Sequence, residues 1–147
     1  MHSFSVATVV MALAITLPHP NALGARVWTP IGAGSAVDQQ SIQRRSDGLI
    51  QAWQRDWLLP NVRKQLEADL RKIGTIVDYS DYGYSIKLWV YDCRNKRLAV
   101  VAGADYSTTG EVINFFDVEP ALTSILPDSG GEVTSKYVCA YKFTNRK

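Results

Sequence analysis

The stretch SIKLWVYDC at residues 85–93 carries apolar side chains on both faces of an extended chain. Such a pattern is typical of a strand in the middle of a sheet, where neighbouring elements cover both faces. A polar turn follows at residues 94–96, and residues 97–106 (RLAVVAGADY) are predicted to pair back as the next strand.

Downstream, the chain continues as short runs separated by Gly- and Ser-containing turns. Residues 107–110 (STTG) predict a hairpin loop, and residues 111–118 (EVINFFDV) predict the returning strand. Residues 119–125 are expected to form one helical turn, and residues 132–143 (EVTSKYVCAYKF) are expected to form the closing strand. Connections this short suit antiparallel neighbours, so the second half predicts a meander rather than parallel βαβ units.

Upstream of this meander, three further extended segments are expected. Residues 27–31 predict a first strand with its turn at residues 32–34, and residues 37–45 (VDQQSIQRR) fit an edge strand or an extended bend. Residues 49–57 (LIQAWQRDW) alternate between an aromatic face and a partly polar face. This alternation favours a strand over the competing interpretation, a short helix.

Residues 61–73 (NVRKQLEADLRKI) carry the helical signal of the chain. Val62, Leu66, Leu70 and Ile73 recur at helical spacing and form one narrow apolar stripe. A stripe of this width is what a helix needs to pack on a sheet. The sequence therefore predicts an α+β fold, an antiparallel meander of about six strands with one amphipathic helix packed on it.

The N-terminus resembles an export signal. Residues 4–17 are apolar or small and uncharged, which is too short for a membrane-spanning helix but typical of a signal core. Ala22-Leu23-Gly24 supplies the small residues of a cleavage site, so residues 1–24 are predicted to be a signal peptide and residues 25–147 a single domain. The alternative is a buried or anchoring helix. No cysteine lies near the cleavage region, so the exported product is expected not to be a lipoprotein.

Cys93 and Cys139 are the only cysteines. In an exported chain a cysteine pair favours a structural disulfide, since neither Cys-x-x-Cys spacing nor a neighbouring histidine indicates a reactive thiol. The bond would close a sequence separation of 46 residues, for which the chain-entropy relation gives about 4 kcal/mol.

Composition argues against most catalytic and nucleic-acid roles. The chain has 16 basic and 14 acidic residues, a net charge of +2, which gives no support for a surface that follows phosphates. Both histidines, His2 and His19, lie in the predicted signal, so the domain would lack imidazole chemistry and most zinc or haem ligation. No cofactor or metal is expected, and the chain is predicted not to be an enzyme. A hydrolase using carboxylates alone stays open as a minor alternative.

One surface is predicted to contact a partner. Three tyrosines lie in a Gly-containing loop beside the basic predicted helix, and aromatic and arginine residues dominate binding hot spots. The alternative is that these rings only cover the junction between helix and sheet. The candidate binding residues are Tyr79, Tyr82, Tyr84, Arg63, Lys64, Arg71 and Lys72.

The order of several short motifs resembles the surface-adhesin protein E family of small exported bacterial domains. The resemblance covers nearly the whole chain from Trp28 onward, and it rests on the order and spacing of its pieces. These are Trp28, residues 37–42 (VDQQSI), Trp53, Tyr91-Asp92-Cys93, residues 106–112 (YSTTGEV), residues 125–132 (ILPDSGGE) and Cys139. Asp128 departs from the glycine that is common in the family's Pro-Gly-Ser turn.

The resemblance implies an antiparallel sheet with a helix on it, tied by a bond between Cys93 and Cys139. It also implies an exported interaction or adhesion domain that binds a protein partner, such as a host matrix protein, in the periplasm or at the cell surface. A periplasmic accessory or inhibitor domain of a bacterial envelope or secretion system is the alternative function.

Overall fold

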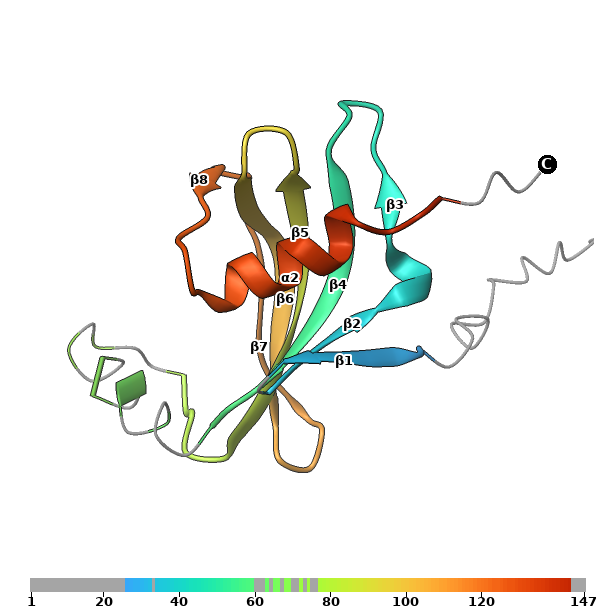
Figure 1. The fold of residues 1–147 in the computed structure, drawn as a ribbon. Coiled ribbons are helices and arrows are strands. Elements are labelled where there is room, and N and C mark those ends of the chain that lie inside the picture. Colours follow the sequence, from blue (N-terminus) through green and yellow to red (C-terminus); the bar gives the residue numbers. More distant parts are fainter. Residues whose placement is uncertain are drawn as a thin grey trace, which may run out of the picture.

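The computed structural model describes residues 26–32, 34–59, 63, 65–66, 68–69, 72, 74 and 77–143. They form an eight-stranded antiparallel sheet with one helix lying across a face of it (Figure 1). The main path of the sheet runs β1-β2-β4-β5-β6-β7, while β3 pairs with β4 and β8 with β6. The strands are β1 (Trp28–Gly32), β2 (Ser35–Asp38), β3 (Gln43–Arg44), β4 (Ile50–Trp57), β5 (Tyr82–Asp92), β6 (Arg97–Ser107), β7 (Val112–Asp117) and β8 (Thr123–Ser124). The short helix η2 spans Gln39–Ser41, and α2 spans Gly130–Cys139.

The α+β class and the antiparallel meander are confirmed. β5 lies in the middle, paired with β4 from Tyr84 to Tyr91 and with β6 along nearly its whole length. The alternating segment at residues 49–57 is a strand, as predicted, and six strands make up the main path of the sheet. The predicted signal peptide, residues 1–24, lies outside the described residues.

The prediction of a closing strand at residues 132–143 was wrong, because residues 132–139 lie in α2 and residues 140–143 belong to no strand. Ser129 caps the helix by accepting a hydrogen bond from the Glu132 amide, while the Glu132 carboxylate accepts one from the Asp128 amide. Ser129 and Glu132 have the Ser-x-x-Glu spacing of a capping box, with the Glu132 carboxylate bonded to the amide of Asp128 rather than to that of the N-cap residue. Thr134 and Val138 then face the core one turn apart.

The helical turn expected at residues 119–125 was also wrong, since Thr123–Ser124 form β8 against Arg97 and Leu98 of β6. Residues 37–45, for which a strand or an extended bend was expected, split into the end of β2, the helix η2 and the two-residue strand β3. Asp38 starts η2 by accepting a hydrogen bond from the Gln40 amide, which ends the strand at that residue.

The main core lies between α2 and one face of the sheet. Val37, Ile50, Ala52, Tyr91 and Val138 are among its buried residues, together with Ile42. Val138 supplies the contribution of α2 and is fully buried. The helix that packs on the sheet is therefore α2. Of the helix predicted at residues 61–73, the described residues 63, 65–66, 68–69 and 72 are helical, and the rest lie outside the described part.

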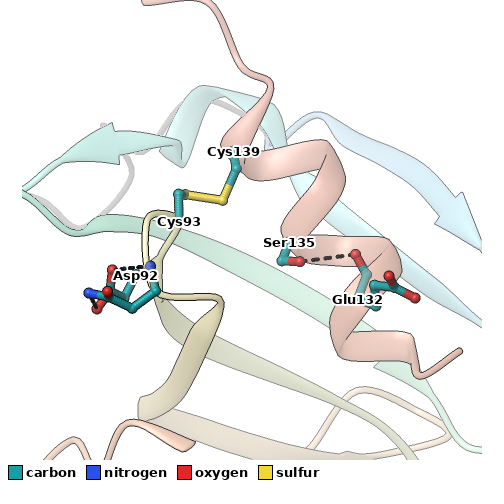
Figure 2. Close-up of a disulfide and its surroundings, with 6 residues drawn as sticks. Asp92, Cys93, Glu132, Ser135 and Cys139 are labelled. Carbon is teal, nitrogen blue, oxygen red and sulfur yellow. Dashed lines mark hydrogen bonds between the residues drawn. A yellow bond between two sulfur atoms is a disulfide. The ribbon is translucent and has the colours of Figure 1, made fainter. Parts of the chain in front are cut away.

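A disulfide joins Cys93 to Cys139, as predicted. Cys93 follows β5 directly and Cys139 is the last residue of α2, with 5.7 Å between their Cα atoms. Figure 2 shows the bond linking the turn after β5 to the end of the helix. The bond therefore holds the C-terminal end of α2 against the end of the central strand β5.

Candidate interaction site

The three tyrosines of the predicted binding loop do not share one surface. Tyr82 is 8% exposed and meets Tyr79 edge to face, with 5.6 Å between ring centroids. The Tyr79 hydroxyl donates to Asp105 Oδ2 at 2.8 Å and accepts from Asn114 Nδ2 at 3.2 Å. Partial burial, followed by the bond to the Asp105 carboxylate, raises the pKa of Tyr79. Both rings therefore anchor the loop to β5, β6 and β7.

Tyr84 lies apart from these two rings. It stacks on Tyr106 of β6 at 4.9 Å between centroids, and the Arg55 guanidinium lies 5.1 Å from its centre. Gly83 separates it from Tyr82 at an irregularity in the pairing of β5 with β6. This irregularity lets the two tyrosines point to different sides of the sheet.

Two basic residues of the predicted binding site, Arg63 and Lys72, lie in the described part of the chain and have different partners. Arg63 donates from Nη2 to the Tyr82 carbonyl at 2.7 Å and from Nη1 to the Ser80 carbonyl at 3.3 Å. Lys72 pairs with Asp69 at 3.2 Å on the exposed side of the helical segment. Lys64 and Arg71 lie outside the described residues. Arg63 therefore contributes to loop structure, and a binding role for the cluster stays a prediction.

A second aromatic cluster lies on the face of the sheet opposite α2. Side chains alternate along β4, so Ile50 and Ala52 pack under α2, whereas Trp53, Arg55 and Trp57 point to the other side. We call this side the aromatic face, and define it by Trp28, Trp53, Trp57, Tyr84 and Tyr106 with Arg26 and Arg55.

Arg55 is the centre of the aromatic face. Its guanidinium carbon lies 4.5 Å from the ring centre of Trp28, 5.6 Å from that of Trp57 and 5.1 Å from that of Tyr84. A cation over aromatic rings gains about 0.5–1 kcal/mol at exposed sites and more where water is excluded. Three rings from three strands thus fix the position of one guanidinium.

Arg26 extends the row of rings and cations. It lies 5.0 Å from the ring centre of Trp53 and 6.0 Å from that of Trp28, and it also pairs with Asp38 at 3.5 Å. Trp57 is 43% exposed, so the row reaches the surface. The alternation at residues 49–57 had already placed its tryptophans on one face. The partners contributed by β1, β5 and β6 depend on pairing that a single sequence does not reveal.

A hollow of about 260 Å³ adjoins this row on the same face. Ala102 and Ala104 of β6 contribute only methyl groups, so the surface is depressed between larger neighbours. Trp53, Ile86, Tyr106 and Arg26 are among the residues around it. The hollow has the size for one or two side chains of a partner, and its lining offers both apolar and polar surface.

A second cleft, of about 280 Å³, lies beside the disulfide between α2 and the β5–β6 turn. Four of its five charged side chains are paired within the cleft: Arg97 donates to Asp92 at 2.8 Å, and Lys136 pairs with Glu132 at 3.0 Å. Hydrogen bonds from Asn95, and then from Arg97, lower the pKa of Asp92 to about 2. These pairs stabilise the turn and the helix, and they leave few free groups for a ligand. The described residues contain no cluster of three or more side chains able to hold a metal ion.

A family model for surface-adhesin protein E matches residues 28–140, which includes every strand and α2. The chain belongs to the surface-adhesin protein E family. Two solved structures of Haemophilus influenzae protein E are similar to it, each at 11% sequence identity. Crystal form II has a TM-score of 0.47 and the match covers 79% of this chain and 96% of that one. The selenomethionine form has a TM-score of 0.45, with 78% and 94% covered. No curated protein sequence matches the chain.

Membership of the surface-adhesin protein E family indicates a role in adhesion at a surface. Within the part of the chain that the structure describes, no helix has the length and apolar character needed to cross a bilayer.

Proposed function

We propose that this chain is an exported domain that acts by binding a protein partner, without chemistry of its own, and that the aromatic face makes the contact. Family membership supports the adhesive role. The observation that carries the choice of surface is Arg55 held between the rings of Trp28, Trp57 and Tyr84 on the face that α2 leaves free. Tryptophan, tyrosine and arginine are the residues most enriched in binding hot spots.

The opposite face supports this assignment, since its apolar side chains are already used by α2 and the disulfide. The aromatic face also continues to the sheet edge. Phe115 of β7 pairs with Ala104 and is 79% exposed, while Val112 is 57% exposed. Because α2 covers one face of the sheet, the aromatic face is the one that is available to a partner.

The test compares three variants of the full oxidised protein with the unmodified protein. Trp57→Ala with Tyr84→Ala removes part of the aromatic face, and Leu126→Ala, a residue 69% exposed beside β8, is the matched control for loss of an exposed apolar side chain. A third variant, Tyr79→Phe with Lys72→Ala, tests the loop predicted from sequence. Binding is measured by biolayer interferometry against a panel of purified host matrix proteins and against proteins captured from envelope extract.

Loss of a hot-spot pair corresponds to about 2 kcal/mol or more, so we expect binding to weaken roughly 30-fold for the aromatic-face variant. The control should bind as the unmodified protein does. Capture of a matrix protein supports the adhesin, whereas capture of one envelope protein alone supports the periplasmic accessory or inhibitor domain. Equal binding by the unmodified protein and the aromatic-face variant would show that the aromatic face does not bind the partner. Loss of binding in the third variant alone would show that the loop predicted from sequence makes the contact.

A further inference from the structure

The side chain of Arg55 has no acceptor among the described residues, a property it shares with Arg44 of β3, which lies 5.2 Å from the Phe143 ring. Arg26 pairs with Asp38, Arg45 with Asp47 and Arg97 with Asp92. Among the described residues, the side chain of Arg55 contacts aromatic rings and has neither a carboxylate nor a carbonyl partner. Its Nε is buried without a hydrogen bond.

Burying a donor of a charged group without an acceptor is costly, and most buried donors in folded proteins are satisfied. The two terminal nitrogens of Arg55 also have no hydrogen-bond partner among the described residues, and neither of them is fully buried. The guanidinium is thus held in place by three rings, with donors left over on the edge formed by its terminal nitrogens. A carboxylate accepts two parallel hydrogen bonds from such an edge.

We infer that the aromatic face binds an acidic segment of a partner protein, with one carboxylate on Arg55 and a neighbouring apolar side chain in the hollow beside Trp53. This inference rests on the proposed function and names the chemistry of its partner. The hollow and the guanidinium belong to one continuous row, because Arg26 borders the hollow and also lies over Trp28, one of the rings that hold Arg55.

A nucleic acid fits this surface less well, although bases also stack on aromatic rings. Nucleic-acid affinity is dominated by many phosphate contacts. Here one cation is unpaired, Arg26 is already partly neutralised by Asp38, and the whole chain has a net charge of only +2. A single carboxylate with an adjacent apolar group matches the surface in both charge and shape.

The probe is a synthetic twelve-residue peptide of alternating Glu and Leu. Gln–Leu and Lys–Leu peptides of the same length serve as controls for the charge. The chain has four tryptophans, and three of them, Trp28, Trp53 and Trp57, lie on the aromatic face. Trp89 packs against the core on the α2 side. The four indole N–H signals in a ¹H–¹⁵N correlation spectrum therefore report where the peptide binds.

We expect the Glu–Leu peptide to shift the signals of Trp28, Trp53 and Trp57 and to leave that of Trp89 unchanged. The Gln–Leu peptide should bind roughly tenfold more weakly, as expected when a charge-assisted hydrogen bond is lost. Affinity should also fall between 50 and 500 mM salt. These measurements use the unmodified protein and need no variant to fold.

Arg55→Gln should weaken Glu–Leu binding roughly tenfold, and Arg55→Lys should restore only part of it because lysine lacks the planar pair of donors. Arg94→Gln, an exposed residue in the β5–β6 turn, is the control with the same change in net charge. Equal affinity for the Glu–Leu and Gln–Leu peptides, or a shift of Trp89 alone, overturns the inference. In that case a loss of partner binding in the Trp57 and Tyr84 variant still supports the proposed function.

Discussion

Removing the disulfide should cost this domain a large share of its stability. The perturbation is the double substitution Cys93→Ser with Cys139→Ser. The bond closes a separation of 46 residues that contains β6, β7, β8 and α2. In the chain-entropy relation, opening such a loop stabilises the unfolded state by about 4 kcal/mol, against a total of about 5–15 kcal/mol for typical domains.

The native contacts of α2 should survive this change. Val138 is fully buried, and Tyr137 and Tyr141 also pack against the core, so the helix keeps an apolar anchor without the bond. Most of the cost should therefore appear through the unfolded state. We expect urea unfolding, followed by tryptophan fluorescence and far-UV circular dichroism, to show coincident transitions at a lower midpoint, with an unfolding free energy about 4 kcal/mol smaller.

Two results would refute this reasoning. A loss below about 1 kcal/mol would mean that the cross-link does little to restrict the unfolded chain. Alternatively, fast hydrogen exchange confined to the amides of α2, together with a smaller dependence on urea, would mean that the helix detaches from an otherwise folded sheet. The unmodified protein after reduction, with its two thiols blocked, is the control, and its unfolding curve should match that of the double variant.

Three further outcomes are expected. Val138→Ala should lower the unfolding free energy by about 2 kcal/mol in urea unfolding, because two buried carbons are lost and a cavity remains; an unchanged midpoint would mean that α2 does not pack as described. The lowered pKa of Asp92, about 2 against 3.8, stabilises the fold above about pH 4 and ceases to do so as pH falls toward 2. The stability difference between the unmodified protein and Asp92→Asn should therefore shrink across that window in acid titrations, and a difference independent of pH would contradict it. Gly103→Ala should destabilise by about 1–3 kcal/mol in thermal unfolding, since its Cβ would lie 2.7 Å from Phe116 and 2.8 Å from the Ile86 carbonyl. Gly130→Ala, with open space around it, is the matched control and should be tolerated.

The strands could be predicted from sequence where one local pattern decides the structure. Residues 85–93 are apolar on both faces and form part of the central strand, and residues 49–57 alternate and form β4. The α2 segment could not be predicted from its composition, because Val133, Tyr137 and Val138 all favour strands. The available signal was Ser129 followed three residues later by Glu132, the capping pair that begins the helix.

The candidate site could be predicted only in part from the sequence, because it depends on how the strands pair. Tyr79, Tyr82 and Tyr84 are close in sequence, but an irregularity in the pairing of β5 with β6 sends Tyr84 to the opposite side from the other two. Their closeness in sequence therefore led to the wrong expectation that the three tyrosines share one surface. Arg55 and Trp28, by contrast, are 27 positions apart and meet because β2 brings β1 alongside β4.

The two faces of the sheet thus have different physical roles, and this follows from which face α2 covers. On the helix side, burial of Val138 and the bond at Cys139 stabilise the fold. On the other side, Arg55 keeps an unsatisfied Nε among three rings, an arrangement that adds little to stability on its own. Arg97 also has a buried, unpaired Nε, but its Nη2 donates to Asp92, whereas Arg55 has no acceptor among the described residues. We expect binding to supply the acceptor that Arg55 lacks. Substitutions on the helix side should therefore change stability first, and substitutions around Arg55 should change binding first.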